Sequence, residues 1–209
     1  MARTRLSLEP FELGSPDWRI HLVTGRQMTR QDYHAFVAAN PELRIERSAR
    51  GEVVIMPPAP TRSGYQNGEI SGRLLDWSLK DGRGIAFDSS AGFDLPNGSN
   101  RSPDASWILK SRVSLLTPDE RNEYWPICPD FVVELRSKSD RLADVQEKMR
   151  EYLDNGAQLG WLIDPIERKA HVYRPGSPPE ILEEPAAIQG DPELPGFTLD
   201  LAEIWNPGF

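Results

Sequence analysis

The chain has 209 residues and a formal charge of −8 at pH 7, with 38% hydrophobic residues and 6 Trp. This length and apolar content predict one folded domain rather than a disordered chain. The negative charge argues against broad electrostatic attraction to nucleic acid, so any nucleic-acid site has to be local.

We expect no membrane segment and a cytoplasmic location. No stretch approaches the roughly 20 apolar residues of a membrane span, and the N-terminal stretch has no apolar core of a secretory signal. The single cysteine, Cys128, permits no disulfide bond within the chain, which suits a reducing compartment. With no His or Cys arranged around it, Cys128 is expected to be a partly buried structural thiol rather than a nucleophile.

The first part of the chain predicts an N-terminal appendage, a helix, a hairpin and a second helix. Residues 1–27 are interrupted by prolines and indicate short strands outside the core. The stretch 29–40 begins with the N-cap candidate Thr29 and predicts a short helix. Two strands joined around "SARG" follow. The next helix is expected to begin near Ser63 and to end at Gly82.

The rest of the chain predicts further strands around an amphipathic helix. Two or three strands with a turn at "PNGSN" come first, then a loop at about 111–128 and an apolar strand. The amphipathic helix is expected to have Ser139 as its N-cap and to stop at Gly156. The stretches "LGWLIDP" and "KAHVYR" predict two strands, and the Pro- and Glu-rich segment 175–195 a loop. A short strand and a helical turn end the chain. This order predicts an α/β layered sheet.

Glu134 interrupts the apolar strand "DFVVEL". Side chains alternate across a strand, so Phe131, Val133 and Leu135 share one face and Glu134 points to the other. Burying a carboxylate among apolar neighbours is costly unless a metal ion or a cationic side chain pairs with it. The residues alone leave both a metal site and an ordinary buried salt bridge open.

A second metal ligand is expected from a neighbouring strand. Asp130 is four residues from Glu134, which puts their Cα atoms roughly 13 Å apart on one strand, too far to share one cation. Asp104 stands at the entrance of another predicted strand, in "SPDASWIL". Its alternative role is to cap the start of that strand.

Lys148 lies at the flank of the apolar stripe on the amphipathic helix. From there its side chain could lean over the sheet edge toward Glu134. The alternative is an ordinary i,i+4 ion pair with Asp144 on the helix surface. Spacing alone does not decide between them.

Four stretches in order carry a resemblance to a known family: "RSPDASWIL", "PDFVVELRS", "DVQEKMREYLDNGAQLGWLIDP" and "AHVYRPG". Together with the upstream "GEVVIMPPAP" they resemble the Uma-two family of restriction endonuclease-like proteins, which is placed in the PD-(D/E)XK nuclease superfamily. The resemblance covers roughly residues 28–175, with residues 1–27 as an appendage and 175–209 as a tail. It implies a restriction endonuclease-like fold: a central mixed β-sheet flanked by helices, with an N-terminal β extension.

The resemblance also implies an active site. Asp104 and Glu134, with the backbone carbonyl of Leu135, would hold Mg²⁺ or Mn²⁺. The catalytic lysine of the family has moved from the strand to the following helix, which corresponds here to Lys148. The implied activity is that of a metal-dependent endonuclease that hydrolyses DNA. A homodimer is also an expectation, because nucleases that cut both strands often pair two active sites.

The chain departs from the family pattern after the glutamate strand. Ser137-Lys138-Ser139 stands where the family has Ser-Pro-Ser, and Arg136 stands where the superfamily's plain E-x-K motif has its lysine. Arginine stays protonated, so Arg136 could hold a phosphate but not act as a base. Lys138 is therefore a rival to Lys148 as the catalytic amine.

Two groups of accessory residues stay open. Glu69, on the second predicted helix, is either a further acidic ligand or a solvated helix charge. Arg136, Lys138 and Arg141 form either a basic rim for phosphates or an exposed turn.

Two other functions remain open beside the endonuclease. A catalytically inactive member of the same fold could serve as a DNA-binding or protein-interaction module, which the net acidity and the missing proline favour slightly. A metal-dependent phosphoesterase could act on a non-DNA substrate.

Overall fold

The computed structural model describes residues 20–22 and 28–209, and the account below concerns these residues. Helices are interspersed among the strands along the chain, and the strands form sheets of six, five and two strands. In chain order the elements are β1 (Ile20–Leu22), α1 (Arg30–Ala39), β2 (Arg44–Arg47), β3 (Val53–Met56), α2 (Thr61–Asp81), β4 (Gly84–Asp88), β5 (Phe93–Asp94), β6 (Asn100–Arg101), β7 (Ala105–Leu109), α3 (Lys110–Val113), the 3₁₀ turn Glu120–Asn122, β8 (Phe131–Leu135), α4 (Leu142–Asp154), β9 (Leu159–Asp164), β10 (Lys169–Tyr173), β11 (Glu180–Glu183), β12 (Ala187–Gln189), β13 (Thr198–Asp200) and α5 (Ala202–Trp205).

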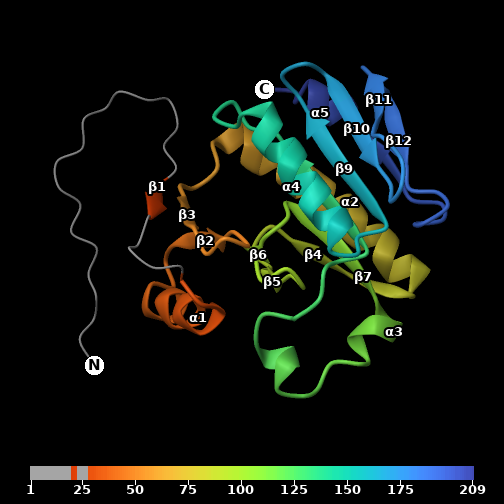
Figure 1. Cartoon of the computed structure of the whole chain (residues 1–209). Helices are drawn as coiled ribbons and strands as arrows, with labels where there is room; N and C mark the ends of the chain where they lie inside the picture. The colour runs from red at the N-terminus through yellow and green to blue at the C-terminus, as the bar shows by residue number, and fades with distance from the viewer. Residues whose placement is uncertain (1–19, 23–27) are drawn as a thin grey trace, which may run out of the picture.

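The central element is a six-stranded mixed sheet in the order β11-β10-β9-β8-β7-β4. Strands β8 and β9 are parallel, and each other neighbouring pair is antiparallel. The parallel pair follows from the chain path, because α4 joins β8 to β9 and a parallel pair needs such a crossover. Figure 1 shows α4 crossing in front of this sheet. The predicted α/β fold with a central mixed sheet is confirmed.

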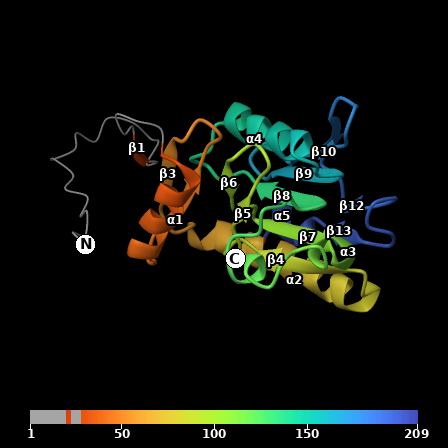
Figure 2. The same ribbon diagram turned by 60° about the horizontal axis from the view of Figure 1, so that its bottom comes forward.

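Helices cover the two faces of this sheet separately. In Figure 2, α4 lies on one side of β7, β8 and β9, and α2 lies on the other. Ile70 and Leu74 of α2 are buried in one apolar cluster, together with the alternate residues of β8, Phe131, Val133 and Leu135. The cluster on the α4 face contains Val132 of β8 and the α4 residues Val145, Met149 and Tyr152. The predicted alternation along β8 is therefore confirmed, and Glu134 belongs to the face that α4 covers.

A second sheet lies at one end of the molecule, in the order β1-β3-β2-β6-β5. Helix α1 packs against it through Tyr33, which is buried with Ile45 and Val53 in a separate apolar cluster. The predicted cap is confirmed, because the side chain of Thr29 accepts from the backbone N–H of Asp32 in a capping box. Most of the predicted appendage 1–27 lies outside the described residues, and β1 is its described part.

Two helix starts differ from the prediction. Helix α2 begins at Thr61 after Pro60 rather than near Ser63, and it ends at Gly82, which has a left-handed φ of 74°. Helix α4 begins at Leu142, not directly after Ser139. The reason is a turn: the carboxylate of Asp140 accepts from the backbone N–H and the hydroxyl of Ser137, which holds residues 137–140 outside the helix.

The segment 175–195 was wrongly predicted to be a loop, whereas the short strand and helical turn predicted after it are confirmed by β13 and α5. Strand β11 pairs with β10, and β12 pairs with β13. The missed strands β11 and β12 have only four and three residues, and the buried residue of β12 is Ile188 alone, so they are too short to show a clear alternation in the sequence. The segment 84–109 likewise holds four strands rather than two or three, because β5 and β6 have two residues each.

Cys128 is 0% exposed, and its Sγ lies 3.4 Å from the backbone oxygen of Tyr152. Burial raises the pKa of this thiol to about 12, so the structural role expected for it is supported, with deeper burial than predicted. Among the described residues, no helix is both long and apolar enough to cross a membrane.

Candidate functional site

A cleft of about 900 Å³ opens between the β2–β3 hairpin, the adjoining ends of β7 and β8, and helix α4. Its lining includes three residues singled out from the sequence, Asp104, Glu134 and Lys148, together with Leu135 and Glu46. Glu46 and Lys148, which are 102 positions apart in the chain, therefore meet in one hollow.

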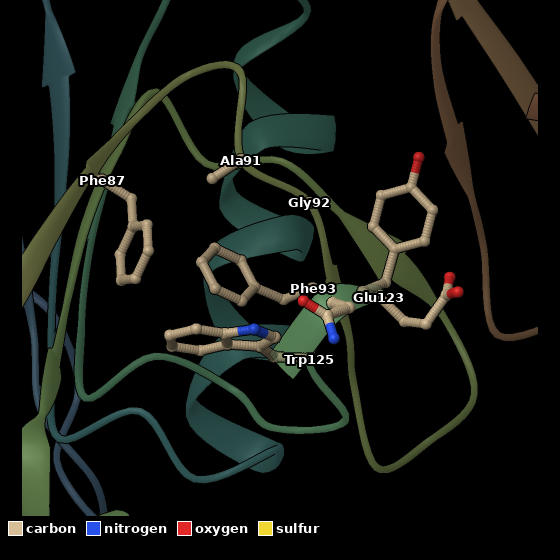
Figure 3. A pocket seen from close by; sticks show the side chains of 8 residues that line it. Phe87, Ala91, Gly92, Phe93, Glu123 and Trp125 are labelled. Carbon is tan, nitrogen blue, oxygen red and sulfur yellow. The ribbon is translucent and has the colours of Figure 1, made fainter. Parts of the chain in front are cut away.

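A second hollow, of about 450 Å³, has a different character. Figure 3 shows the rings of Phe87, Phe93 and Trp125 gathered along it. Glu123 is the one charged residue of its lining. The larger cleft is therefore the candidate site for acid–base or metal chemistry.

Asp104 and Glu134 come from neighbouring strands, as predicted. The antiparallel register places Ala105 of β7 opposite Val133 of β8, so the next pair along is Asp104 and Glu134, on one face of the sheet. One carboxylate oxygen of Asp104, Oδ2, accepts the backbone N–H of Leu135 at 2.9 Å. Asp104 thus fixes the end of β8 while its side chain lines the cleft.

Asp130 is held elsewhere. Its carboxylate accepts the backbone N–H of Leu109 at 2.9 Å and lies 2.8 Å from a guanidinium nitrogen of Arg112. It is not part of the cleft lining. The exclusion of Asp130 as a ligand agrees with this placement.

Lys148 is brought to Glu134. Its Nζ lies 2.9 Å from Oε1 of Glu134 and 2.9 Å from Oε1 of Glu46. Within residues 28–209, these two glutamates are its ion-pair partners, and the alternative pair with Asp144 does not form. Helix α4 supplies a second donor one turn later, because the hydroxyl of Tyr152 donates to Oε1 of Glu134 at 2.9 Å.

The contacts of Glu134 leave one of its oxygens open. Lys148 and Tyr152 both reach Oε1, and no described residue donates to Oε2. A carboxylate held at one oxygen and open at the other can still take a cation at the open one. Strand β8 holds the backbone of Glu134 in a fixed position, because all five of its residues are buried.

Glu46 is held more firmly than Glu134. Oε1 of Glu46 accepts the backbone N–H of Ser102 at 3.0 Å, and Oε2 lies 3.2 Å from Nη1 of Arg101. The same guanidinium lies 2.6 Å from Glu151 of α4. Arg101 therefore ties the hairpin carboxylate to the helix that carries Lys148.

The charges in the cleft are unequally balanced. Burial raises the pKa of Glu134 to about 7, and the nearby carboxylates of Asp104 and Glu46 add to this while Lys148 opposes it. Burial also raises the pKa of Glu46, but Lys148 and Arg101 outweigh it and hold that pKa well below its usual range. Burial raises the pKa of Asp104. Burial therefore outweighs the nearby cations at Glu134 and Asp104, whereas the cations prevail at Glu46.

The oxygen atoms around Asp104 and Glu134 are suitable ligands for a hard cation. Asn67 of α2 donates from Nδ2 to Oδ1 of Asp104 at 3.1 Å, while its own buried amide oxygen has no hydrogen-bond partner among the described residues. No group of three acidic, His or Cys side chains in the described part of the chain forms a ready cage. A cation would therefore draw on two carboxylates, the backbone and water, which is the pattern usual for Mg²⁺.

Sequence reasoning missed Glu46, Arg101, Tyr152 and Asn67. Glu46 gave a faint signal, because "RIER" places a charged residue between strand positions beside an apolar hairpin. Arg101 stands three residues before Asp104 in "RSPD", and Tyr152 is one helical turn after Lys148. Neither spacing specifies the partner.

Glu69 lies apart from the other acidic candidates. Its carboxylate lies 3.0 Å from Arg73, one helical turn further along α2, and it does not line the cleft. This placement favours the alternative of a solvated helix charge. Lys138 is exposed and also lies outside the cleft lining, so Lys148 is the lysine beside Glu134.

Arg136 does not form a free basic rim. Its Nη1 lies 2.6 Å from Asp164, whose side chain is 0% exposed. Asp164 also accepts the backbone N–H groups of Ile166 and Glu167 after β9. This ion pair argues against a role of Arg136 in holding a phosphate, because a buried carboxylate already binds its guanidinium.

Replacing Arg136 with Met is expected to destabilise the fold. The substitution leaves Asp164 buried without its cation, a change that typically costs about 3–5 kcal/mol. Urea unfolding measures the loss, and Lys138→Met is the matched control, expected to stay within about 0.5 kcal/mol as an exposed substitution. Equal stabilities of the two variants would contradict the structural role of Arg136.

Comparison with known proteins gives one family and one fold. The model of the Uma2 family, described as "Putative restriction endonuclease", matches residues 30–202, well beyond the end of the predicted match at 175. The crystal structure of a "putative nuclease belonging to DUF820" from Anabaena variabilis is similar, with a TM-score of 0.67 and 23% identity over 78% of this chain and 90% of that chain. At this identity the likeness concerns the fold. None of the curated proteins compared matches the chain.

Proposed function

The chain belongs to the Uma2 family, and from that premise we propose that it is a metal-dependent endonuclease that hydrolyses DNA phosphodiester bonds. The observation that carries the proposal is the meeting of Asp104, Glu134 and Lys148 in one open cleft. Two carboxylates from adjacent strands and a lysine from the following helix are the residue types that this chemistry needs.

Each residue has a definite task in the proposed reaction. Asp104 and Glu134, with the backbone carbonyl of Leu135, would hold Mg²⁺ or Mn²⁺. A bound cation of this kind polarises the phosphodiester and lowers the pKa of a water ligand. Lys148 orients the attacking water or stabilises the negative charge that develops on the phosphate oxygens. Tyr152 keeps Glu134 in place by its hydrogen bond to Oε1.

The bonds that change are those of a hydrolysis. The water oxygen forms a bond to phosphorus, and the bond from phosphorus to the leaving oxygen breaks. The water loses a proton, and the leaving oxygen gains one. No oxidant or further reactant is needed.

The charge of the cleft favours a second candidate function. Nine acidic and five basic side chains line it, so a long duplex with its dense phosphate charge meets repulsion. A metal-dependent phosphoesterase that takes a smaller, less charged phosphodiester fits such a lining better. An inactive DNA-binding or protein-interaction module is the third reading.

One experiment separates these readings. Supercoiled plasmid and bis(p-nitrophenyl) phosphate are incubated with the protein in Mg²⁺, Mn²⁺ or EDTA, beside Asp104→Asn and the control Glu69→Gln. Cleavage of the plasmid that needs metal and is lost only in Asp104→Asn supports the endonuclease. Hydrolysis of the small diester with an intact plasmid supports the phosphoesterase, and metal binding without either activity supports the inactive module.

Metal affinity is expected to rise with pH. Burial holds a proton on Glu134 up to a pKa of about 7, and a metal ion takes the ionised carboxylate, so binding below that pH must release the proton. The affinity should therefore fall by up to about tenfold for each pH unit below 7 and level off above it. Calorimetric titration of Mn²⁺ in two buffers of different ionisation enthalpy counts the released protons. Proton-free binding at about pH 6 would contradict this.

A homodimer remains a prediction, since the structure contains one chain. Sedimentation of the protein with and without DNA would measure its oligomeric state.

A further inference from the structure

One ammonium group serves two carboxylates in this cleft. Nζ of Lys148 lies 2.9 Å from Glu134 and 2.9 Å from Glu46. We propose that Glu46 is the positioning residue that holds Lys148 in the active site while Glu134 engages the metal ion. This inference rests on the proposed function and assigns a role to a residue outside the six-stranded sheet.

The two partners of Lys148 differ in how firmly they are fixed. Glu134 has Lys148 and Tyr152 on one oxygen and no donor from the described residues on the other. Glu46 has both oxygens occupied, by Arg101 on one and by Ser102 and Lys148 on the other. Its side chain is 6% exposed. Glu46 is therefore the fixed anchor, and Glu134 is the partner that can change its contacts.

A metal ion and an ammonium group compete for the same carboxylate. When Glu134 gives its charge to a cation, its attraction for Lys148 weakens and the two positive charges repel. Without a second partner, the flexible lysine side chain would either leave the site or stay on Glu134 and oppose the cation. Glu46 supplies that second partner, because its Oε1 also lies 2.9 Å from Nζ of Lys148.

Through Glu46, the five-stranded sheet contributes to the site. Glu46 lies on β2, and Arg101, which holds it, lies on β6 of the same sheet. Arg101 also lies 2.6 Å from Glu151, on the helix that carries Lys148. The five-stranded sheet thus supplies the counterion of the proposed catalytic lysine, and the active site is incomplete without it.

The test is a cycle of metal affinities. Mn²⁺ is titrated calorimetrically into the parent, Glu46→Gln, Lys148→Met and the double variant. If Glu46 draws Lys148 away from Glu134, then Glu46→Gln leaves the lysine competing with the metal and weakens binding by about 10-fold or more, the range for residues that support ligands. With Lys148→Met already present, the same change should alter the dissociation constant by no more than about twofold.

Two controls isolate the effect. Glu52→Gln removes the same charge from an exposed position on the same hairpin that also lines the cleft, and it measures the effect of losing a nearby charge that does not pair with Lys148. Glu46→Asp keeps the charge but shortens the side chain by one methylene group, so an intermediate weakening is expected. Thermal unfolding shows that each variant is folded, and Glu46→Asp carries the test if Glu46→Gln is not.

The outcomes separate this inference from the proposed function. Weakening by Glu46→Gln that is equal with and without Lys148, or no greater than that of Glu52→Gln, overturns the anchor while the parent still binds metal and cleaves. A parent that binds no Mn²⁺ and cleaves no phosphodiester overturns the proposed function and the inference with it. Among active variants, a lower kcat at unchanged KM in Glu46→Gln is the kinetic signature of a displaced Lys148.

Discussion

Replacing Glu134 with glutamine is expected to abolish Mn²⁺ binding and metal-dependent cleavage while the protein stays folded. The amide has no charge with which to hold a cation, and a metal ion typically supplies several kcal/mol of transition-state stabilisation, so the rate should fall by roughly 10³-fold or more. Calorimetric titration measures the binding, and single-turnover cleavage of labelled DNA measures the rate.

The fold should tolerate this change because of how Glu134 sits. Burial already raises the pKa of its carboxyl group, so a neutral side chain of the same size removes a poorly compensated charge. The hydroxyl of Tyr152 can donate to the amide oxygen in place of Oε1. Lys148 keeps its contact with Glu46. Thermal unfolding close to that of the parent is therefore expected.

Glu69→Gln is the control for Glu134→Gln. It makes the same chemical change on an α2 carboxylate that pairs with Arg73 and lies outside the cleft. Parent-like cleavage by Glu134→Gln, or equal losses in both variants, would show that the metal site has been assigned to the wrong carboxylate.

The centre of the fold could be predicted from local patterns. The alternation in "DFVVEL" places Glu134 on the face opposite Phe131 and Val133, and the structure shows that arrangement. The apolar stripe of α4 places Lys148 at its edge, within reach of that face. Both statements use a single element and its period, 2 for a strand and 3.6 for a helix. The sheet then only has to bring the two elements together.

The anchor of the lysine could not be predicted in this way. Glu46 and Lys148 are 102 residues apart, and they meet because a hairpin of a second sheet packs beside α4. Nothing in "RIER" shows which helix that hairpin faces. Contacts between separate elements depend on tertiary packing, which leaves no period in the sequence.

Arg136 illustrates a different difficulty. Its position and charge made it a candidate for phosphate binding. In the structure its Nη1 instead lies 2.6 Å from Oδ2 of Asp164, at the end of the neighbouring strand β9. The parallel pairing of β8 and β9 brings the ends of the two strands together, so the arginine after one strand meets the aspartate of the other. Sequence reasoning that treats a charged turn as solvent-exposed overlooks such partners.

The cleft combines a fixed part and an adjustable part. The fixed part is Glu46, whose two carboxylate oxygens are contacted by Arg101 and Ser102. Glu46 and Arg101 lie on strands of the five-stranded sheet. Asp104 and Glu134 carry raised pKa values, and Glu134 has one oxygen to which no described residue donates. A site that is to bind a cation needs such incompletely compensated carboxylates, because fully paired ones would give up as much energy as the metal returns.

Replacing Lys148 with methionine is expected to lower kcat by about 10²–10³-fold, the usual effect of losing one group that stabilises developing charge. Mn²⁺ binding should be retained or become tighter, because the substitution removes a cation that lies 2.9 Å from Glu134. Single-turnover cleavage at saturating Mn²⁺ separates the two effects. Weakened metal binding in Lys148→Met would contradict the competition between lysine and metal.

Lys138→Met decides between the two lysines. Lys138 is exposed and lies outside the cleft lining, so its replacement should leave kcat within about twofold of the parent. The Lys148 variant should fold, since Glu46 keeps Arg101 and Ser102, and methionine preserves most of the buried aliphatic stem. If Lys138→Met loses activity and Lys148→Met keeps it, the catalytic amine belongs to the turn after β8, and the contact between Lys148 and Glu46 serves stability alone.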